Sequence, residues 1–157
     1  MLLNKIILRY ILYVLIVVSL LFPSTRDCPE NFVPNPQYTE DSEDNIPECV
    51  PFSFDYIQSS NQAFYYFSNV TIQGISLDNN DWVAAFNGDV CIGSRMWDVS
   101  QCNNETCDVP VMGNDGASYS SNYIEEGQIP SFKIYDFSDN IYYDAIPSSQ
   151  EPWSSNL

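Results

Sequence analysis

Apolar and polar residues alternate with a period of two along much of the chain after residue 50, which is the pattern of β-strands with one buried face. In the clearest example, Trp82, Ala84 and Phe86 fall on one face of a single strand. The other predicted strands are 51–57, 62–67, 69–77, 89–97, 130–137 and 141–146. No window of a dozen residues has a helical period, so the pattern predicts an all-β fold, an antiparallel β-sandwich of the Ig-like or jelly-roll-like kind.

Two residues that favour a tight turn follow the strand that contains Trp82. Asn87 and Gly88 both tolerate the positive φ angles that the central positions of a type I′ turn require. We therefore predict a hairpin with Asn87-Gly88 at its tip, joining strands 82–86 and 90–96.

Residues 1–25 have the composition of a secretory signal peptide. Lys5 and Arg9 precede a mostly apolar run, 10–22, which as a helix is roughly 20 Å long and shorter than the ~30 Å core of a bilayer. The region that follows lacks a small residue at the −3 position of a cleavage site, so an N-terminal membrane anchor remains the alternative. Both interpretations place the rest of the chain outside the cytoplasm.

The remainder of the chain divides at about residue 50. Residues 26–49 are rich in proline, asparagine and acids and predict an irregular arm, whereas 50–157 carry the strand pattern. Trp153 lies four residues from the last residue, and a buried tryptophan normally has a strand around it. We therefore expect the sandwich domain to be C-terminally truncated, as in a fragment of a longer protein.

All five cysteines lie beyond the signal segment, which agrees with export to an oxidising compartment. We predict disulfides Cys28–Cys49 and Cys102–Cys107, and Cys91 as a small buried apolar residue in a strand. Pairing of Cys91 with Cys102 or Cys107 remains an alternative, because spacing does not fix connectivity.

The charge of the chain excludes several functions. It has 21 acidic residues, 5 basic residues and no histidine, and after residue 25 the formal charge is 3 − 21 = −18. Such a polyanion is repelled by nucleic acids, so no nucleic-acid partner is expected, and membrane contact is expected only through an uncleaved N-terminal segment. Without histidine, a Ser-His-Asp triad and histidine-ligated metals are excluded.

Three stretches, 81–94 (DWVAAFNGDVCIGS), 107–116 and 127–147, together resemble an uncharacterised extracellular β-sandwich module. Such modules occur in large secreted and surface proteins of marine and Bacteroidetes-like bacteria, beside adhesion repeats, carbohydrate-active domains or sorting domains. The resemblance covers about residues 50–153 and departs at Ala84, where glycine is usual, and at Gln128, where aspartate is usual. It implies a cell-surface or secreted location and a sandwich fold, and it leaves the ligand open.

Aromatic side chains are the candidates for a sugar-stacking surface, because pyranose C–H faces pack on aromatic rings. Trp82 is more simply explained as a core residue, since it shares a face with Ala84 and Phe86. The candidate ligand-binding residues in or beside turns are Trp97, Tyr119, Tyr123, Tyr142 and Tyr143.

Loop carboxylates and asparagines are candidates for a structural Ca²⁺ site, because calcium prefers hard oxygen ligands. The same residues are common in turns, and none matches the EF-hand spacing. The favoured candidates are Asp78, Asn80 and Asp81 in one loop and Asp136 and Asp139 in another; further ones are Asp98, Asp108, Asn114, Asp115 and Asp144.

These observations favour a non-catalytic secreted or cell-surface module for adhesion or carbohydrate binding, with a polysaccharide or another surface protein as partner. Two alternatives are a passive spacer repeat of a larger surface protein and, more remotely, a glycosidase-like enzyme that uses paired carboxylates. No cofactor other than calcium is expected.

Overall fold

The computed structural model describes residues 27–40, 46–102 and 106–155, and the predicted signal segment lies outside them. These residues form antiparallel strands and three short 3-10 helices, so the expected all-β fold is confirmed. Within the described ranges no helix is long and apolar enough to cross a membrane. The strands are β1 (Phe32–Pro34), β2 (Cys49–Pro51), β3 (Gln62–Phe67), β4 (Thr71–Ile72), β5 (Ile75–Ser76), β6 (Trp82–Asn87), β7 (Val90–Met96), β8 (Cys107–Met112), β9 (Ser131–Asp136) and β10 (Ile141–Ala145), and the 3-10 helices are η1 (Phe52–Phe54), η2 (Val99–Gln101) and η3 (Ser118–Ser120).

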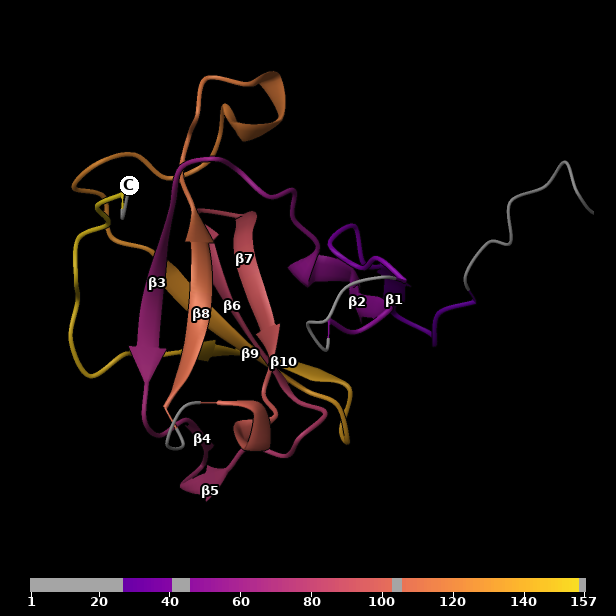
Figure 1. The fold of residues 1–157 in the computed structure, drawn as a ribbon. Helices are drawn as coiled ribbons and strands as arrows, with labels where there is room; N and C mark the ends of the chain where they lie inside the picture. Colours follow the sequence, from indigo (N-terminus) through magenta and orange to yellow (C-terminus); the bar gives the residue numbers. More distant parts are fainter. Residues whose placement is uncertain (1–26, 41–45, 103–105, 156–157) are drawn as a thin grey trace, which may run out of the picture.

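The structure has three layers (Figure 1). A four-stranded sheet in the order β10-β9-β6-β7 forms the middle layer, and the two-stranded sheet β3-β8 packs on one of its faces. The strand pair β1-β2 and η1 cover the opposite face. The strands β4 and β5 form a separate small hairpin at one end.

Strand β6 is buried on both of its faces, which the sequence pattern did not predict. Val83 and Ala85 point into the core shared with β3 and β8, and Trp82, Ala84 and Phe86 point into the core beneath the N-terminal arm. The prediction that Trp82 is a core residue is confirmed by its exposed fraction of 3%. The molecule therefore has two cores, and β6 belongs to both. We call the one between the middle sheet and β3-β8 the first core, and the one beneath the N-terminal arm the second core.

The described part of the predicted irregular arm, residues 26–49, is mostly without regular structure, but it contributes β1 and the first residue of β2. Val33 pairs with Val50, and the Cys28–Cys49 disulfide closes the same region. The ring of Phe32 lies edge-on to that of Tyr135, with 5.7 Å between centroids. The arm is therefore a layer of the fold, fixed by apolar contacts, pairing and a disulfide.

The prediction of a strand over residues 51–57 is wrong. Phe52–Phe54 form the 3-10 helix η1, which turns Phe54 into the second core while 69% of the Phe52 surface is exposed. The Phe54 ring contacts that of Phe86 edge-on at 5.8 Å. Alternation of phenylalanines therefore arose here from a tight turn, in which only one of the two rings is buried.

The predicted hairpin between β6 and β7 is present, but its tip differs from the prediction. Asn87 pairs with Val90, so the two loop residues are Gly88 and Asp89. Gly88 has a φ of +60°, and neither Asn87 nor Asp89 has a positive φ. Positive φ at the first loop position alone is the pattern of a type II′ turn, not type I′.

A turn with the type I′ pattern occurs instead between β4 and β5, within the predicted strand 69–77. Its central residues Gln73 and Gly74 have φ angles of +53° and +85°, and Ile72 pairs with Ile75 across it. Gln73-Gly74 is a weak turn signal in the sequence, because glutamine is uncommon at positive φ.

The burial of Trp153 needs no surrounding strand, contrary to the expectation from the sequence. Its indole N–H donates to the carbonyl oxygen of Val111 at 3.0 Å, and its backbone N–H donates to Gln128 at 2.7 Å. A Cβ atom on Gly113 would lie 2.3 Å from the indole ring, so a glycine makes room for the side chain. Trp153 therefore fixes the C-terminal segment to the sandwich.

Gly88→Val is expected to destabilise the protein by about 1–2 kcal/mol, because a side chain at positive φ is strained and a β-branched one more so. No atom lies within 4 Å of a Cβ built there, so the loss comes from backbone strain alone. Asp89→Val, at the neighbouring tip position with negative φ, is the control and should change the free energy of unfolding by less. Urea titration of both variants tests this, and equal stabilities would contradict the turn assignment.

Candidate functional site

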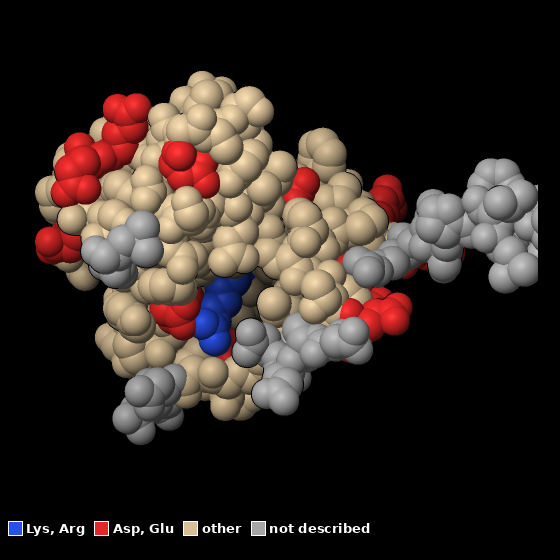
Figure 2. Space-filling model, turned by 45° about the horizontal axis from the view of Figure 1, so that its top comes forward, with Lys and Arg blue, Asp and Glu red and all other residues tan. Residues whose placement is uncertain are grey.

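A hollow of about 760 Å³ lies between the N-terminal arm and the edge where β7 and β8 meet. Asn35, Gln37 and Pro47 line it from the arm, and Arg95 and Asp108 line it from the two strands. Figure 2 shows basic atoms inside a hollow beside the arm, on a face whose other charged side chains in view are acidic. The hollow is the candidate site.

The floor of the hollow exists because the two sheets touch at β7 and β8. A Cβ on Gly93 would lie 1.7 Å from the carbonyl oxygen of Pro110, so only glycine permits this approach. Pro110 has no N–H group, which suits a strand edge that has no ladder partner. The close contact brings Arg95, two residues after Gly93, opposite Asp108, two residues before Pro110.

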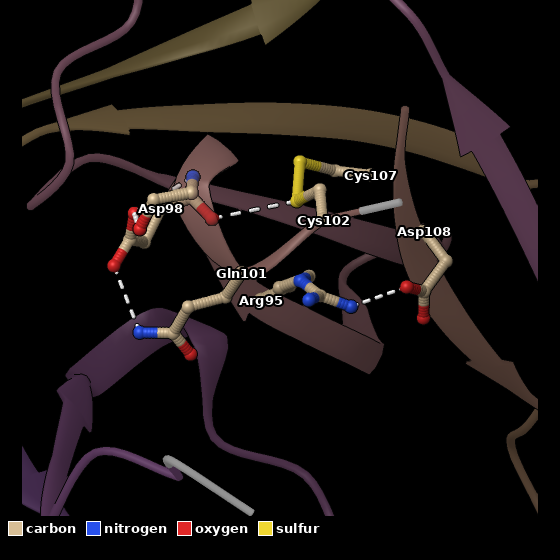
Figure 3. Close-up of a disulfide and its surroundings, with 7 residues drawn as sticks. Arg95, Asp98, Gln101, Cys102, Cys107 and Asp108 are labelled. Atoms are coloured by element: carbon tan, nitrogen blue, oxygen red, sulfur yellow. Dashed lines mark hydrogen bonds and ion pairs between the residues drawn. A yellow bond between two sulfur atoms is a disulfide. The ribbon is translucent and has the colours of Figure 1, made fainter. Parts of the chain in front are cut away.

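Arg95 and Asp108 form an ion pair between β7 and β8 (Figure 3). About a quarter of each side chain is exposed, 26% for Arg95 and 28% for Asp108, so the pair faces the hollow and is partly desolvated. Because the charges cancel, the floor of the hollow is polar and carries no net charge from this pair.

The Cys102–Cys107 disulfide fixes the adjoining wall (Figure 3). It joins the residue after η2 to the first residue of β8, and the Cys102 sulfur lies 3.4 Å from the backbone oxygen of Asp98. The Gln101 side-chain amide donates to the Asp98 carboxylate at 2.8 Å. Both predicted disulfides are present, and Cys91 is free and buried, as expected.

Amide side chains supply most of the remaining polar groups in the hollow. Asn35 donates to Pro47 and Gln37 donates to the Tyr56 carbonyl oxygen at 2.7 Å, so these two hold the arm in place. Gln58 and Gln62 also line the hollow, and their side chains have no hydrogen-bond partner within the described ranges. These two amides are therefore open to a ligand.

Two ionisable groups of the hollow, Asp98 and Tyr56, have pKa values that the structure moves away from neutrality. Hydrogen bonds, first from the Ser100 hydroxyl and then from the Gln101 amide, lower the pKa of Asp98. Burial raises the pKa of Tyr56 far above its ordinary value of 10.0. Asp98 is thus ionised and Tyr56 neutral at pH 7, and both are suited to hydrogen bonding.

The structure does not gather the five aromatic residues proposed from the sequence. Trp97 and Tyr123 are 3% and 6% exposed and lie in the first core, so neither ring is accessible to a ligand. The Tyr142 ring contacts that of Phe54 at 5.3 Å, and its neighbour Tyr143 packs against the first core. Tyr119 is exposed but donates its hydroxyl to Asp115 at 2.8 Å.

The two loops proposed for calcium lie side by side at one end of the middle sheet. The Asp81 carboxylate accepts the backbone N–H of Asp78 at 2.7 Å and that of Phe137 at 2.9 Å. The Asp136 carboxylate accepts N–H groups of Ser138 and Asp139. No group of three or more cysteine or acidic side chains in the described ranges is arranged to hold a metal ion. Asp81 and Asp136 thus serve as turn acceptors, and calcium binding at Asp78, Asn80, Asp81, Asp136 and Asp139 stays a prediction.

Comparison with protein-family models, with curated proteins and with solved structures gives no match. The module resemblance suggested by residues 81–94 accordingly remains an expectation.

The residues that form the hollow were not proposed as a site from the sequence. Asp98 and Asp108 appeared only as calcium candidates, and Arg95, Gln58 and Gln62 were not singled out. The one available signal was Arg95 itself, since it is one of only three basic residues after residue 25 and an isolated cation in so acidic a chain requires a partner.

Asp115 is the most extensively hydrogen-bonded carboxylate in the loop that contains η3. It accepts from the Ser120 hydroxyl at 2.6 Å, the Tyr119 hydroxyl at 2.8 Å and the Ala117 N–H at 3.1 Å. It also accepts from the backbone of Ser60, which joins this loop to the residues before β3. These bonds, that of Ser120 foremost, hold the pKa of Asp115 well below its ordinary 3.8.

Asp115→Asn is expected to lower Tm at pH 7, and the difference from the parent should shrink as the pH falls below 3.8. A carboxyl whose pKa is depressed by folding stabilises the native state above its unfolded pKa and loses that contribution as acid protonates it. Asp139→Asn removes the same charge from a carboxylate with no hydrogen bond in the described ranges, and it is the control. A pH-independent difference for Asp115→Asn would contradict the assignment.

A calcium site at the Asp78 and Asp139 end of the sheet predicts that CaCl₂ raises Tm more than NaCl does at equal ionic strength. A site with a Kd of about 1 mM would add about 1.4 kcal/mol in about 10 mM calcium, which is a shift of several degrees. Thermal melts in the two salts measure this. Equal shifts would show screening of the −18 charge alone.

Proposed function

We propose that this protein is a non-catalytic, secreted or cell-surface β-sandwich module that binds polysaccharide in the hollow between the arm and the β7–β8 edge. The observation that carries the proposal is the chemistry of that hollow, in which the open amides of Gln58 and Gln62 lie beside the Arg95–Asp108 pair.

Sugar hydroxyls donate and accept hydrogen bonds, and they match groups that do both. Each amide side chain offers an acceptor oxygen and two N–H donors, whereas arginine only donates and an ionised carboxylate only accepts. Aromatic and apolar surfaces, from Phe64 and Met96, lie in the same hollow and suit the C–H faces of a pyranose. A concave site with a few convergent polar groups is the usual form of a ligand site.

The two disulfides support an oxidising, extracellular location. The predicted signal segment agrees with this, although it lies outside the described residues. Secretion and display at the cell surface are both compatible with this part of the proposal.

The ionisation of the hollow supports binding over catalysis. A glycosidase needs one carboxyl that stays protonated to serve as general acid, with its pKa raised. Of the two aspartates that line the hollow, Asp98 has a lowered pKa and Asp108 is paired with Arg95. Hydrogen bonds therefore favour the ionised form of Asp98, which is the opposite of what a general acid requires.

We expect the full chain to bind at least one soluble polysaccharide in affinity gel electrophoresis and isothermal titration calorimetry. Gln62→Ala should weaken that binding about tenfold without changing Tm, because one or two hydrogen bonds are lost at an exposed site. Gln73→Ala, in the exposed β4–β5 turn outside the hollow, should bind as the parent does. Absence of binding across a broad panel of polysaccharides would reject the proposal and favour a spacer.

A further inference from the structure

We infer that the ligand is an extended, uncharged polysaccharide chain that runs from the hollow across the outer face of β3 to a second hollow beside that strand. This inference rests on the proposed function and specifies its ligand class and its path. The inference depends on Phe64, because this residue lines both hollows and so connects them.

The outer face of β3 carries three residues in a row. Gln62, Phe64 and Tyr66 point away from the core, while Ala63 and Tyr65 point into it or pack against it. Phe64 is 37% exposed and Tyr66 is 68% exposed. At a strand rise of about 3.4 Å per residue, their Cα atoms are roughly 7 Å apart along the strand, which suits stacking of successive sugar rings.

The facing strand continues this surface towards the first hollow. Phe64 pairs with Pro110, and Tyr66 pairs with Asp108, whose carboxylate binds Arg95. A chain lying on the two rings therefore also passes the polar groups of the first hollow. An open amide, two exposed rings and an ion pair thus share one continuous face.

The second hollow, of about 350 Å³, separates β3 from the C-terminal segment 147–154. Figure 1 shows that segment running past β3 on the side away from β8. Its lining includes Ile129, Pro147 and Pro152 together with serine side chains, a mixture of apolar and hydroxyl groups. A ligand filling both hollows must be long enough to cross Phe64, which excludes a monosaccharide.

Charge selects against acidic polysaccharides. The chain after residue 25 carries −18, and none of the lining residues of the second hollow is basic. Arg95 is the single cation among the described residues that line the first hollow, and it is already paired with Asp108. Polyuronates and sulfated glycans are therefore repelled, whereas a neutral chain avoids this repulsion.

A peptide strand added to the free edge of β3 fits the structure less well. The Tyr65 hydroxyl donates to the carbonyl oxygen of Glu151 at 3.0 Å, so the C-terminal segment is bonded across the middle of that edge. Pairing along the edge would also leave the outward rings of Phe64 and Tyr66 unused.

The test compares short and long neutral oligosaccharides by calorimetry with the full chain, using cellobiose, xylobiose and mannobiose against cellohexaose, xylohexaose and mannohexaose. Polygalacturonate and alginate are the anionic probes. We expect at least one hexasaccharide to bind ten times or more tighter than its disaccharide, and the anionic chains to bind more weakly than the neutral one at low salt.

Tyr66→Ala should weaken hexasaccharide binding about five- to tenfold and leave disaccharide binding nearly unchanged, and Phe64→Ala should weaken hexasaccharide binding at least as much. Phe52→Ala is the matched control, because Phe52 is 69% exposed and lines neither hollow.

Binding that depends on Gln62 but neither on the length of the oligosaccharide nor on Tyr66 would overturn the inference and leave the proposed function intact. Preference for an anionic chain, or for an extended peptide, would also overturn the inference, while failure of every glycan to bind would reject the proposed function itself.

Discussion

The burial of β6 on both faces is the constraint on which the rest of the structure depends. A strand in the interior of a small protein needs a layer on each side, and Ala84 and Ala85 have no exposed surface. The small side chains at the centre of the strand let both covering layers approach closely, while Trp82 and Phe86 fill the space at its ends on the arm side. Without the arm, the larger residues of that face would be exposed to water.

The arm therefore stabilises the fold and also shapes the candidate site. The arm is short, and it contacts the sheet through Phe32, next to the contacts that Val50 and Phe54 make just after it. Beyond these contacts a hollow separates the arm from β7 and β8, and its lining mixes amide side chains with apolar ones such as Phe64 and Met96. The Gln37 amide, which donates to the Tyr56 carbonyl oxygen, ties the arm to the body beside this hollow.

Alternating large apolar residues made the middle sheet and β3 predictable from the sequence, although period-two burial holds clearly only in β3, since β6 and β7 are buried on both faces. Prediction failed where a residue was buried for another reason. Phe54 enters the core from a turn, Trp153 lies in a segment without strand pairing and is held by hydrogen bonds, and β1 has only three residues.

The candidate site could not be predicted from the alternation of apolar and polar residues. Its polar residues are single positions in separate segments: Gln58, Gln62, Arg95 and Asp108. The close contact of β7 with β8 at Gly93 brings these residues together. In the sequence, Gly93 is only a glycine within a predicted strand, and nothing there indicates the contact.

The polar residues of the hollow contribute little to the stability of the fold, so stability does not explain why the hollow is polar. An ion pair with about a quarter of each side chain exposed contributes roughly 1 kcal/mol or less. The side chains of Gln58 and Gln62 form no hydrogen bond with another described residue, so they add nothing to stability in this way. Apolar residues at the same positions would close the gap between the arm and the β7–β8 edge and bury more surface, at about 25 cal/mol for each Å². The structure instead keeps an open, hydrogen-bonding hollow next to exposed aromatic rings, in a protein with a strongly acidic composition. That combination agrees with the proposed neutral ligand with many hydroxyl groups, since the overall charge disfavours anionic ligands.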